Sequence, residues 1–363
     1  MKIDDVFAKA LDFSETPKTL ANIFLDKSVS RRRYAVGKNN ETLELNRLIP
    51  LDGIVDDYSV SGAEWHGIPL IKIRDVQSGD MVANCSSSIS PIAVLERLES
   101  SQVDGIVGIH ELIIASNGLL GWPEFVKTMH LELENIEKWQ EMYDSFSDEE
   151  SRRTFLDIAQ YRLTANPKYM ENYRVRIDEQ YFEDFMQFSN EIFVDAGGFD
   201  GDTSEIFANR YSDYRKILFF EPSSKNMAAA LKRLVKHERI EFYSIGLSNA
   251  PEMLQFNQDA GSASSVTEAG SETINVDMLD KLLREPVTFI KMDLEGWELK
   301  ALEGARQTIL SHHPKLAIAV YHNSQDFRVI FEYIRSLGLG YEIFLRHYTQ
   351  GWSETIMFFL PRK

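Results

Sequence analysis

The sequence predicts an α/β protein that has a mostly parallel sheet in its C-terminal half and a smaller α/β domain before it. Two observations lead to this prediction. Residues 186–363 contain several short apolar runs, each ending at a polar residue and leading into a helical pattern, as expected of a parallel sheet. Residues 1–118 show the same alternation with shorter segments. A chain of 363 residues is long enough for each domain to bury its own core.

The N-terminal domain is predicted over residues 1–118, beginning with one or two amphipathic helices in residues 1–28. Strands are expected at 34–36, 51–55, 68–73, 80–83 and 104–106, with helices at 41–48 and 92–98. The stretch 52–73 resembles the incomplete Rossmann-like domain at the front of some sugar-modifying enzymes. Its first turn, GKNNET, holds one glycine. The domain is therefore either structural or a ligand site, with Asp56 and Asp57 as the candidate residues.

Residues 119–185 are predicted to form a helical connector, because charged and aromatic residues recur there at helical spacing. Two interpretations remain open for its tyrosines. Tyr161, Tyr169 and Tyr173 either pack the two domains together or cover the active-site cleft and stack on a sugar.

A glycine-rich turn follows an apolar run in the segment EIFVDAGGFDGDT, residues 191–203. The turn departs from the pattern G-x-G-x-x-G, so the dinucleotide motif is not met. Asp195, Asp200 and Asp202 crowd the turn with negative charge, which would repel a pyrophosphate. This favours a nucleoside cofactor with a positive centre, such as S-adenosylmethionine.

A second acidic residue stands at the spacing that a nucleoside cofactor needs. The apolar run 217–220 ends in Glu221, which follows Asp195 by 26 residues (221 − 195 = 26). This is about one strand–helix–strand unit, and an acid at the end of the second strand of such a unit binds ribose hydroxyls. Glu221 is therefore the predicted ribose-binding residue, and a helix cap is the alternative role.

Two further apolar runs end at residues that can carry chemistry. The run 288–292 is followed by Asp293, and the run 316–320 is followed closely by His322. Ligands of open α/β sheets bind outside the carboxyl ends of the strands. We therefore expect these two residues to lie on the same edge of the sheet as the two acids described above.

Four segments of the C-terminal half carry a family resemblance: VDAGGFDGDTS (194–204), FFEPS (219–223), INVDMLD (274–280) and, most specifically, FIKMDLEGWELKALEGA (289–305). They resemble the FkbM family of S-adenosylmethionine-dependent methyltransferases. The resemblance covers roughly the C-terminal half. It implies O-methylation of a hydroxyl, often on a sugar, a glycan or a polyketide-type product.

The resemblance also implies a seven-stranded, Rossmann-like methyltransferase domain in residues 186–363, in which 341–345 and 355–360 form a final antiparallel hairpin. The implied cofactor is S-adenosyl-L-methionine. The predicted cofactor-binding residues are Asp195, Ala196, Gly197, Gly198, Gly201, Asp202, Thr203, Glu221, Pro222, Gly246 and Asp293. Gly246 is expected at the adenine edge, and segment 259–271 is expected to be a mobile loop near the cofactor.

An alcohol that accepts a methyl group must lose its proton, so a base or a metal ion should lie nearby. His322, Asp293 and Lys291 are the candidate catalytic residues. His322 is alternatively the cap of the next helix, and Lys291 is alternatively an ion-pair partner of Asp293 or Glu295.

Asp293, Glu295 and His322 are also candidates for a Mg²⁺ or Mn²⁺ site, because carboxylate oxygens and one imidazole suit these ions. The sequence holds no tightly spaced metal motif that would fix the choice. Glu298 and Glu303 are expected to be exposed on a helix.

The formal net charge of −17 argues against nucleic acid as a substrate, because a polyanion would be repelled. A small-molecule or glycan acceptor is therefore expected.

The single cysteine, Cys85, fits a reducing compartment. No apolar run approaches the roughly 20 residues of a membrane span, and the N-terminus is unlike a signal peptide. We expect a cytoplasmic protein, with homo-oligomerisation left open.

Two other functions fit parts of the sequence. A nicotinamide-dependent sugar-nucleotide oxidoreductase would use the N-terminal domain. The G-x-G-x-x-G pattern is missing there, and the Y-x-x-x-K spacing from Tyr34 to Lys38 runs from a strand into a turn. A non-catalytic binding module would keep the cofactor fold as a scaffold, but Asp195, Glu221 and Asp293 are intact.

Overall fold

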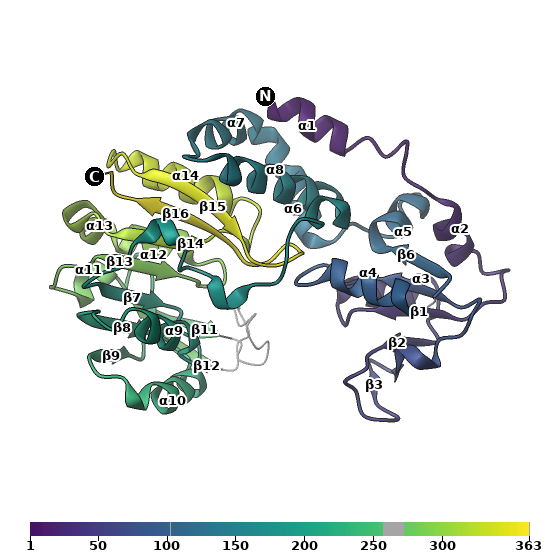
Figure 1. Ribbon diagram of the computed structural model, residues 1–363, viewed down its shortest axis with the longest axis horizontal. Helices are drawn as coiled ribbons and strands as arrows, with labels where there is room; N and C mark the ends of the chain where they lie inside the picture. Colours follow the sequence, from purple (N-terminus) through teal and green to yellow (C-terminus); the bar gives the residue numbers. More distant parts are fainter. Residues whose placement is uncertain (102, 257–271, 363) are drawn as a thin grey trace. The chain divides into compact units, whose positions relative to one another are not determined.

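The chain folds into two compact units, as the computed structural model shows for residues 1–101, 103–256 and 272–362 (Figure 1). Unit 1 consists of Met1–Gln140, Arg153–Val175 and Tyr348–Ser353, and unit 2 of Glu141–Arg152, Arg176–His347 and Glu354–Lys363. Each unit thus gathers segments that are distant in the sequence. The loop expected at 259–271 lies outside the described residues. The domain boundaries 1–118, 119–185 and 186–363 remain a proposal.

Unit 1 is built around a six-stranded sheet in the order β3-β4-β2-β1-β5-β6. Its strands are β1 (Arg33–Val36), β2 (Gly53–Val55), β3 (Glu64–Trp65), β4 (Ile68–Ile71), β5 (Met81–Asn84) and β6 (Gly105–Gly108). Parallel pairing runs from β1 through β2 to β4 on one side and through β5 to β6 on the other. The antiparallel β3 was not predicted, because two residues give no alternation. The chain starts in the middle of the sheet, builds one side and then crosses to the other, as in doubly wound folds.

The helices within unit 1 are α1 (Ile3–Ala10), α2 (Thr19–Leu25), α3 (Asn40–Leu48), α4 (Pro91–Ser100), α5 (Ile109–Ala115) and α6 (Glu124–Glu132). Two more, α7 (Ile136–Ser145) and α8 (Glu149–Thr164), are divided between the units.

Tyr161 of α8 is buried, and its hydroxyl donates to the carbonyl of Ser87 at 2.8 Å. Tyr161 therefore packs the interior of unit 1, and the sugar-stacking interpretation is wrong for this residue. Cys85 is also buried, and burial raises the pKa of its thiol to about 12.

Unit 2 contains the predicted seven-stranded sheet, in the order β15-β16-β14-β13-β7-β8-β9. Its strands are β7 (Ile192–Ala196), β8 (Lys216–Phe220), β9 (Ile240–Tyr243), β13 (Phe289–Met292), β14 (Lys315–Ala319), β15 (Glu342–His347) and β16 (Thr355–Leu360). The strands from β14 to β9 are parallel, and β16 and β15 form an antiparallel hairpin at one edge. The predicted fold class is confirmed.

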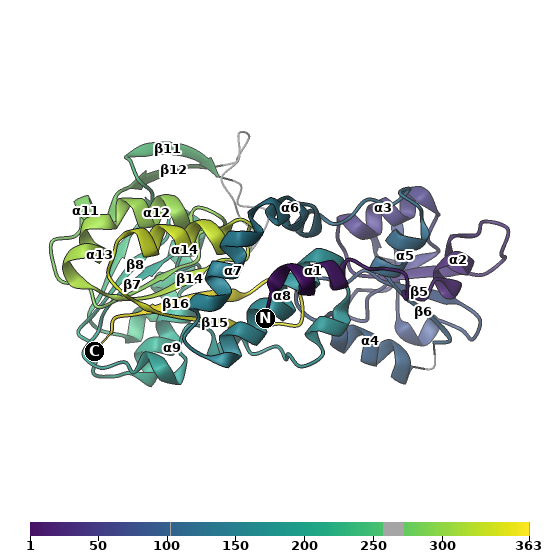
Figure 2. The ribbon, with the colours of Figure 1, turned by 90° about the horizontal axis from the view of Figure 1, so that it is seen from above.

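A second, small sheet in unit 2 joins β10 (Gly246–Leu247), β12 (Glu272–Asp277) and β11 (Glu252–Phe256). The helices of unit 2 are α9 (Asp202–Arg210), α10 (Ser224–Arg233), α11 (Leu279–Leu282), α12 (Glu298–Gly304), α13 (Arg306–His312) and α14 (Asp326–Ser336). Helices cover both faces of the seven-stranded sheet, with α9 on one face and α12 and α14 on the other (Figure 2). Among the described residues, no helix combines the length and the apolar character needed to cross a membrane.

Aromatic rings fix α9 against the middle of the seven-stranded sheet. Phe207 of α9 lies 4.6 Å from Phe193 of β7, ring centre to ring centre, and Phe193 stacks on Phe289 of β13 at the same distance. All three side chains are fully buried. Large aromatic side chains dominate core energetics, so this stack holds in place the helix that follows the glycine-rich turn.

Replacing Phe207 with Ala is expected to lower the free energy of unfolding by about 3–5 kcal/mol, because a cavity would form between α9 and the sheet. Urea denaturation followed by circular dichroism measures this change. Leu231→Ala on α10 is the control, since its side chain is 48% exposed. A change below about 0.5 kcal/mol is expected there. Equal losses in the two variants would contradict the packing described.

Candidate active site

The candidate site lies along the edge of the seven-stranded sheet where the parallel strands end. β7 is paired with both β8 and β13, and β13 is paired with β14. Asp195 is the last but one residue of β7, Glu221 follows β8, Asp293 follows β13, and His322 comes shortly after β14. The structure thus places the four predicted residues at the carboxyl ends of four neighbouring strands.

The glycine-rich turn after β7 is shaped by the protein's own packing. Gly197 has φ +72°, and a Cβ there would lie 1.9 Å from the carbonyl oxygen of Asp293. A Cβ on Gly198 would lie 2.1 Å from the ring of Phe219. Both glycine amides donate to the carbonyl of Phe220 at 3.0 Å. These contacts explain why glycine is required at both positions. That Gly197 and Gly201 also let a cofactor approach the backbone stays a prediction.

Asp195 and Lys291 form a buried ion pair beneath this turn. Nζ of Lys291 lies 3.1 Å from Oδ1 of Asp195 and donates to the carbonyls of Gly197 at 2.7 Å and Ala196 at 3.4 Å. The other carboxylate oxygen accepts from Ser204 at 2.6 Å. The Asp195 side chain is 0% exposed. It is therefore closed to a cationic ligand, contrary to the sequence-based expectation.

The environment of Lys291 does not suit a general base. Burial alone would lower its pKa, but the carboxylates of Asp195 and Asp293 outweigh burial and raise the pKa above the ordinary value. The ammonium therefore keeps its proton. Its partner is Asp195, across the β7–β13 pairing, rather than Asp293 or Glu295 as the alternative reading expected.

Glu221 lies directly after β8 with its carboxylate held by two backbone amides. One oxygen accepts from Phe199 at 3.0 Å and the other from Ser223 at 2.8 Å. Burial raises the pKa of Glu221 to about 7, against the opposing effect of these hydrogen bonds. The carboxylate is thus fixed in direction.

The remaining predicted cofactor residues lie around these two strand ends. Pro222 is close to Gly246, where an added Cβ would stand 3.6 Å from the proline Cγ. Asp202 and Thr203 open α9, after Gly201, which has φ +86°. Unlike Asp195, Asp202 is exposed.

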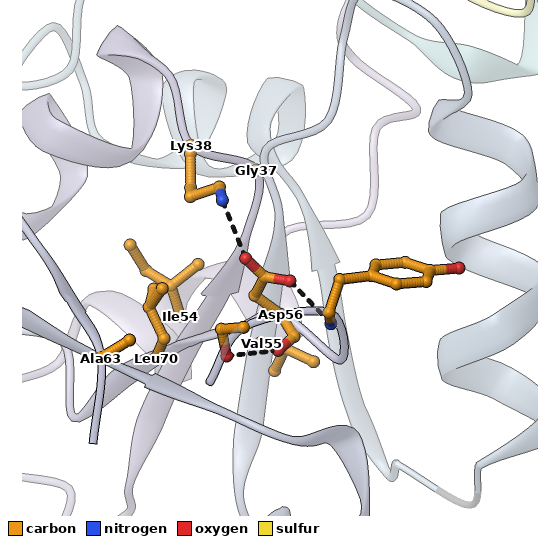
Figure 3. A pocket seen from close by; sticks show the side chains of 9 residues that line it. Gly37, Lys38, Ile54, Val55, Asp56, Ala63 and Leu70 are labelled. Atoms are coloured by element: carbon orange, nitrogen blue, oxygen red, sulfur yellow. Dashed lines mark hydrogen bonds and ion pairs between the residues drawn. The ribbon is translucent and has the colours of Figure 1, made fainter. Parts of the chain in front are cut away.

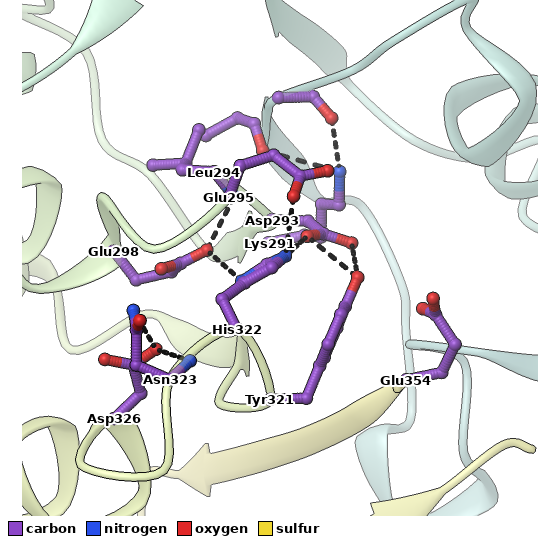
Figure 4. A network of polar contacts seen from close by, with 12 residues as sticks. Lys291, Asp293, Leu294, Glu295, Glu298, Tyr321, His322, Asn323, Asp326 and Glu354 are labelled. Atoms are coloured by element: carbon purple, nitrogen blue, oxygen red, sulfur yellow. Dashed lines mark hydrogen bonds and ion pairs between the residues drawn. The ribbon is translucent and has the colours of Figure 1, made fainter. Parts of the chain in front are cut away.

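A cluster of acidic residues surrounds His322 at the ends of β13 and β14 (Figure 4). Its Nε2 lies 3.4 Å from Oδ1 of Asp293 and 3.3 Å from Oε2 of Glu295, while Nδ1 lies 3.1 Å from Oε1 of Glu298. Burial alone would lower the pKa of His322, but these carboxylates outweigh it and raise the pKa to about 10. The imidazole is thus protonated at neutral pH, which does not suit the general base that we expected.

Two tyrosine hydroxyls orient the carboxylate of Asp293. Tyr181 donates to Oδ2 at 2.7 Å, and Tyr321 lies 3.3 Å from Oδ1. Burial raises the pKa of the neighbouring Glu295 to about 8 and that of Glu354 to about 7. Tyr181 and Glu354 were not predicted from the sequence, because both reach the cluster from segments far away along the chain.

Glu298 corrects another expectation. We expected an exposed helix residue, but it is 0% exposed, and Oε1 accepts from the amide of Leu294 at 2.7 Å. As the first residue of α12 it turns back toward the strand end. Glu303, further along the same helix, is exposed as expected and accepts from Asn249.

Unit 1 holds a separate cavity of about 500 Å³ at the carboxyl ends of β1 and β2 (Figure 3). Its lining residues are Gly37, Lys38, Ile54, Val55, Asp56, Tyr58, Ser59, Ala63 and Leu70. Asp56 pairs with Lys38 at 2.8 Å, and this contact lowers the pKa of Asp56. Asp57 instead pairs with Arg97 and accepts from the amide of Ile73. Of the two predicted candidates, Asp56 therefore faces the cavity, while Asp57 has a structural role.

One solved structure supports this architecture along nearly the whole chain. Methyltransferase FkbM from Methylobacillus flagellatus KT is similar over 98% of this chain and 99% of its own, with 23% identity and a TM-score of 0.76. An rRNA methylase from Streptococcus thermophilus is similar over 49% of this chain and 90% of its own, with 18% identity and a TM-score of 0.33. Fibrillarin from Aeropyrum pernix, solved with natively bound S-adenosyl-L-methionine, is similar over 47% of this chain and 67% of its own, with 15% identity and a TM-score of 0.31. The comparison with curated proteins returns no match.

The parallel sheet with its terminal hairpin defines a Rossmann-like methyltransferase fold, which the M. flagellatus structure shares along nearly the whole chain. Residues 195–343 match the family model of the Methyltransferase FkbM domain. These residues are therefore similar to the FkbM methyltransferase domain, and the fold is that of a Rossmann-like methyltransferase.

Replacing Lys291 with Met is expected to lower the free energy of unfolding by about 3–5 kcal/mol, because Asp195 would remain buried without its cation. The double variant Lys291→Met/Asp195→Asn removes both charges and should recover much of this loss. Chemical denaturation of both proteins measures the difference. Equal stability of the single variant and the wild type would contradict a buried charge pair.

Proposed function

We propose that the protein is an S-adenosylmethionine-dependent O-methyltransferase that moves a methyl group to a hydroxyl of a sugar or glycan. The observation that carries the proposal is the FkbM domain at 195–343, whose sheet brings Glu221 and Asp293 to one edge. The cofactor would supply a methyl group on a positively charged sulfur. The residues of the chain would then hold the acceptor and take its proton.

Glu221 is proposed to bind the ribose of the cofactor. The amides of Phe199 and Ser223 hold its carboxylate in one direction, so little ordering remains to be done on binding. A carboxylate accepts two neighbouring hydroxyls in a way that few other side chains can. This role is compatible with the capping contact to Ser223.

Pro222 and Gly246 are proposed to line the adenine side, because they lie against each other next to Glu221. Asp202 is proposed as the acid that faces the cationic end of the cofactor, since it is exposed at the start of α9. Asp195 contributes indirectly, by holding the turn in place through Lys291.

Asp293 is the proposed acceptor of the hydroxyl proton, with Tyr181 and Tyr321 fixing its orientation. Carboxylates and tyrosine hydroxyls provide the hydrogen bonds that a polyhydroxylated sugar requires.

The net charge of −17 supports a small-molecule or glycan acceptor over a nucleic acid. The single, buried cysteine supports a cytoplasmic location.

Affinity for S-adenosylmethionine is expected to rise as the pH increases through about 7, where Glu221 becomes a carboxylate. Calorimetric titrations across this range measure it. The pKa of Glu221 is raised above the ordinary 4.5 in the folded protein. Protonated Glu221 therefore contributes fully to the stability of the ligand-free protein below pH 4.5, and this contribution is lost as the pH rises through about 7. Glu221→Gln is expected to weaken binding about tenfold or more and to flatten the pH dependence.

Glu285→Gln is the matched control, because Glu285 pairs with Lys216 at the opposite end of β8. Its binding should equal that of the wild type. Methyl transfer is then tested by incubating the protein and cofactor with sugars and glycans and detecting methylated products by mass spectrometry. Failure of the wild-type protein to bind S-adenosylmethionine would contradict the proposal.

Nucleotide binding by unit 1 is a second candidate function, favoured by one observation. The cavity lies at the carboxyl ends of the first two strands of a doubly wound sheet, with Asp56 at the end of β2 and Lys38 in the turn after β1. In such sheets an acid at this position binds ribose, and a cation in the first turn is suited to a phosphate.

Titration with ADP and UDP tests this second candidate. Saturable binding is expected in the wild type and should weaken at least tenfold in Asp56→Asn, because hydrogen bonds to a charged group are lost. Asp104→Asn serves as the control, since Asp104 is an exposed acid that contacts Ser78. If neither nucleotide binds, this second candidate function is contradicted and unit 1 has a structural role.

A further inference from the structure

The imidazole of His322 is nearly buried but lacks an aligned hydrogen bond. Its side chain is 8% exposed, and neither ring nitrogen has a hydrogen-bond partner among the described residues. Within the same described part, Oε2 of Glu298 also has none, although its side chain is 1% exposed. Buried polar atoms are satisfied in the large majority of cases, so these unsatisfied atoms in one place point to a ligand that binds there.

Carboxylate oxygens face both sides of the imidazole ring (Figure 4). Asp293 and Glu295 face Nε2 at 3.4 Å and 3.3 Å, and Glu298 faces Nδ1 at 3.1 Å. Asp293, Glu298 and His322 each offer an atom within 4.8 Å of the other two. Ligand atoms that are each about 2 Å from one ion lie about 3–4 Å from one another. The distances from Nε2 to Asp293 and to Glu295 fall in this range and suit a shared cation.

The two sides of the ring differ in access. Glu298 is enclosed, and its Oε1 already accepts from the amide of Leu294. The side chains of Asp293 and Glu295 are 19% and 28% exposed, so the Nε2 side is the one open to a ligand. Histidines that bind a metal through one nitrogen usually donate the other N–H to a carboxylate, and Glu298 stands in that position.

Acidic side chains outnumber basic ones around this ring. The acids of the cluster are Asp293, Glu295, Glu298, Asp326 and Glu354 (Figure 4). The nearby ammonium of Lys291 pairs with Asp195 and donates to the carbonyl of Gly197.

We propose that Asp293, Glu295 and His322 bind one divalent cation, which takes the place of the proton on Nε2, and that Glu298 orients the imidazole. Mn²⁺ fits better than Mg²⁺, because Mg²⁺ prefers a shell made of oxygen atoms alone. Three protein ligands leave positions open for an oxygen of the acceptor, which the cation would hold and polarise. Binding of the ion stands on the geometry alone, whereas its use in methyl transfer rests on the proposed function.

Titration of the metal-free protein with Mn²⁺ tests the site, with free Mn²⁺ followed by its paramagnetic resonance signal. One saturable site is expected in the wild type. Glu295→Gln and His322→Ala should weaken binding at least 100-fold, because each removes a ligand. Glu298→Gln should weaken it about 10- to 100-fold, as is typical when an orienting partner is lost. Glu303→Gln, an exposed acid on the same helix, should bind like the wild type.

Circular dichroism confirms that each variant is folded. Glu295→Gln is the decisive variant, because its partly exposed side chain is not needed for the core. Absence of saturable Mn²⁺ binding in the wild type would overturn the proposal, as would full retention of binding in Glu295→Gln. Because this readout does not involve the cofactor, a protein that binds Mn²⁺ but not S-adenosylmethionine would support the cation site and contradict the proposed function. Methyl transfer that persists unchanged after chelation would overturn the role of the cation in catalysis.

Discussion

The buried ion pair between Lys291 and Asp195 is the interaction on which the rest of the site depends. The two residues are register partners on β13 and β7, so their charges compensate each other inside the sheet. The ammonium also holds the carbonyls that begin the glycine-rich turn, which brings Gly197 against the backbone of Asp293. Neither charge could remain buried alone at small cost. The pair therefore fixes the relative position of the turn and the strand end that carries Asp293.

From this fixed centre, the edge of the sheet divides into two chemically different parts. On the β8 side, Glu221 is a single carboxylate held by backbone amides, which suits recognition of a neutral, hydroxyl-bearing group. On the β13 and β14 side, several carboxylates converge on His322, and tyrosine hydroxyls hold Asp293. The part around Glu221 can bind and orient a ligand, while the part around His322 can move a proton or hold a cation. Keeping the two parts on separate strands lets each have its own electrostatic environment.

Much of the fold could be predicted from the sequence, because the strands of a parallel sheet are continuous apolar runs and the acids at their ends interrupt them. The partners of individual side chains could not be predicted, because they depend on strand register and on contacts between segments that are far apart in the sequence. Two acids near Lys291 in the sequence, Asp293 and Glu295, were its expected partners, whereas the pairing of β13 with β7 selects Asp195. Tyr181 reaches Asp293 across 112 residues. Helical periodicity places Glu298 on an exposed helix, yet as the first residue of α12 it turns inward to the imidazole. The glycines were recognised as a turn, but whether they admit a ligand or a neighbouring backbone is a matter of packing.

The central claim is that the carboxyl edge of this sheet binds the nucleoside cofactor and the acceptor side by side. A crystal structure of the protein with S-adenosylhomocysteine, the product that remains after methyl transfer, tests it most directly. The account predicts that the ribose hydroxyls contact Glu221, that the adenine lies beside Pro222 and Gly246, and that the sulfur points toward Asp293. A nucleoside bound in the cavity of unit 1 beside Asp56, with the edge around Glu221 free of ligand, would contradict it.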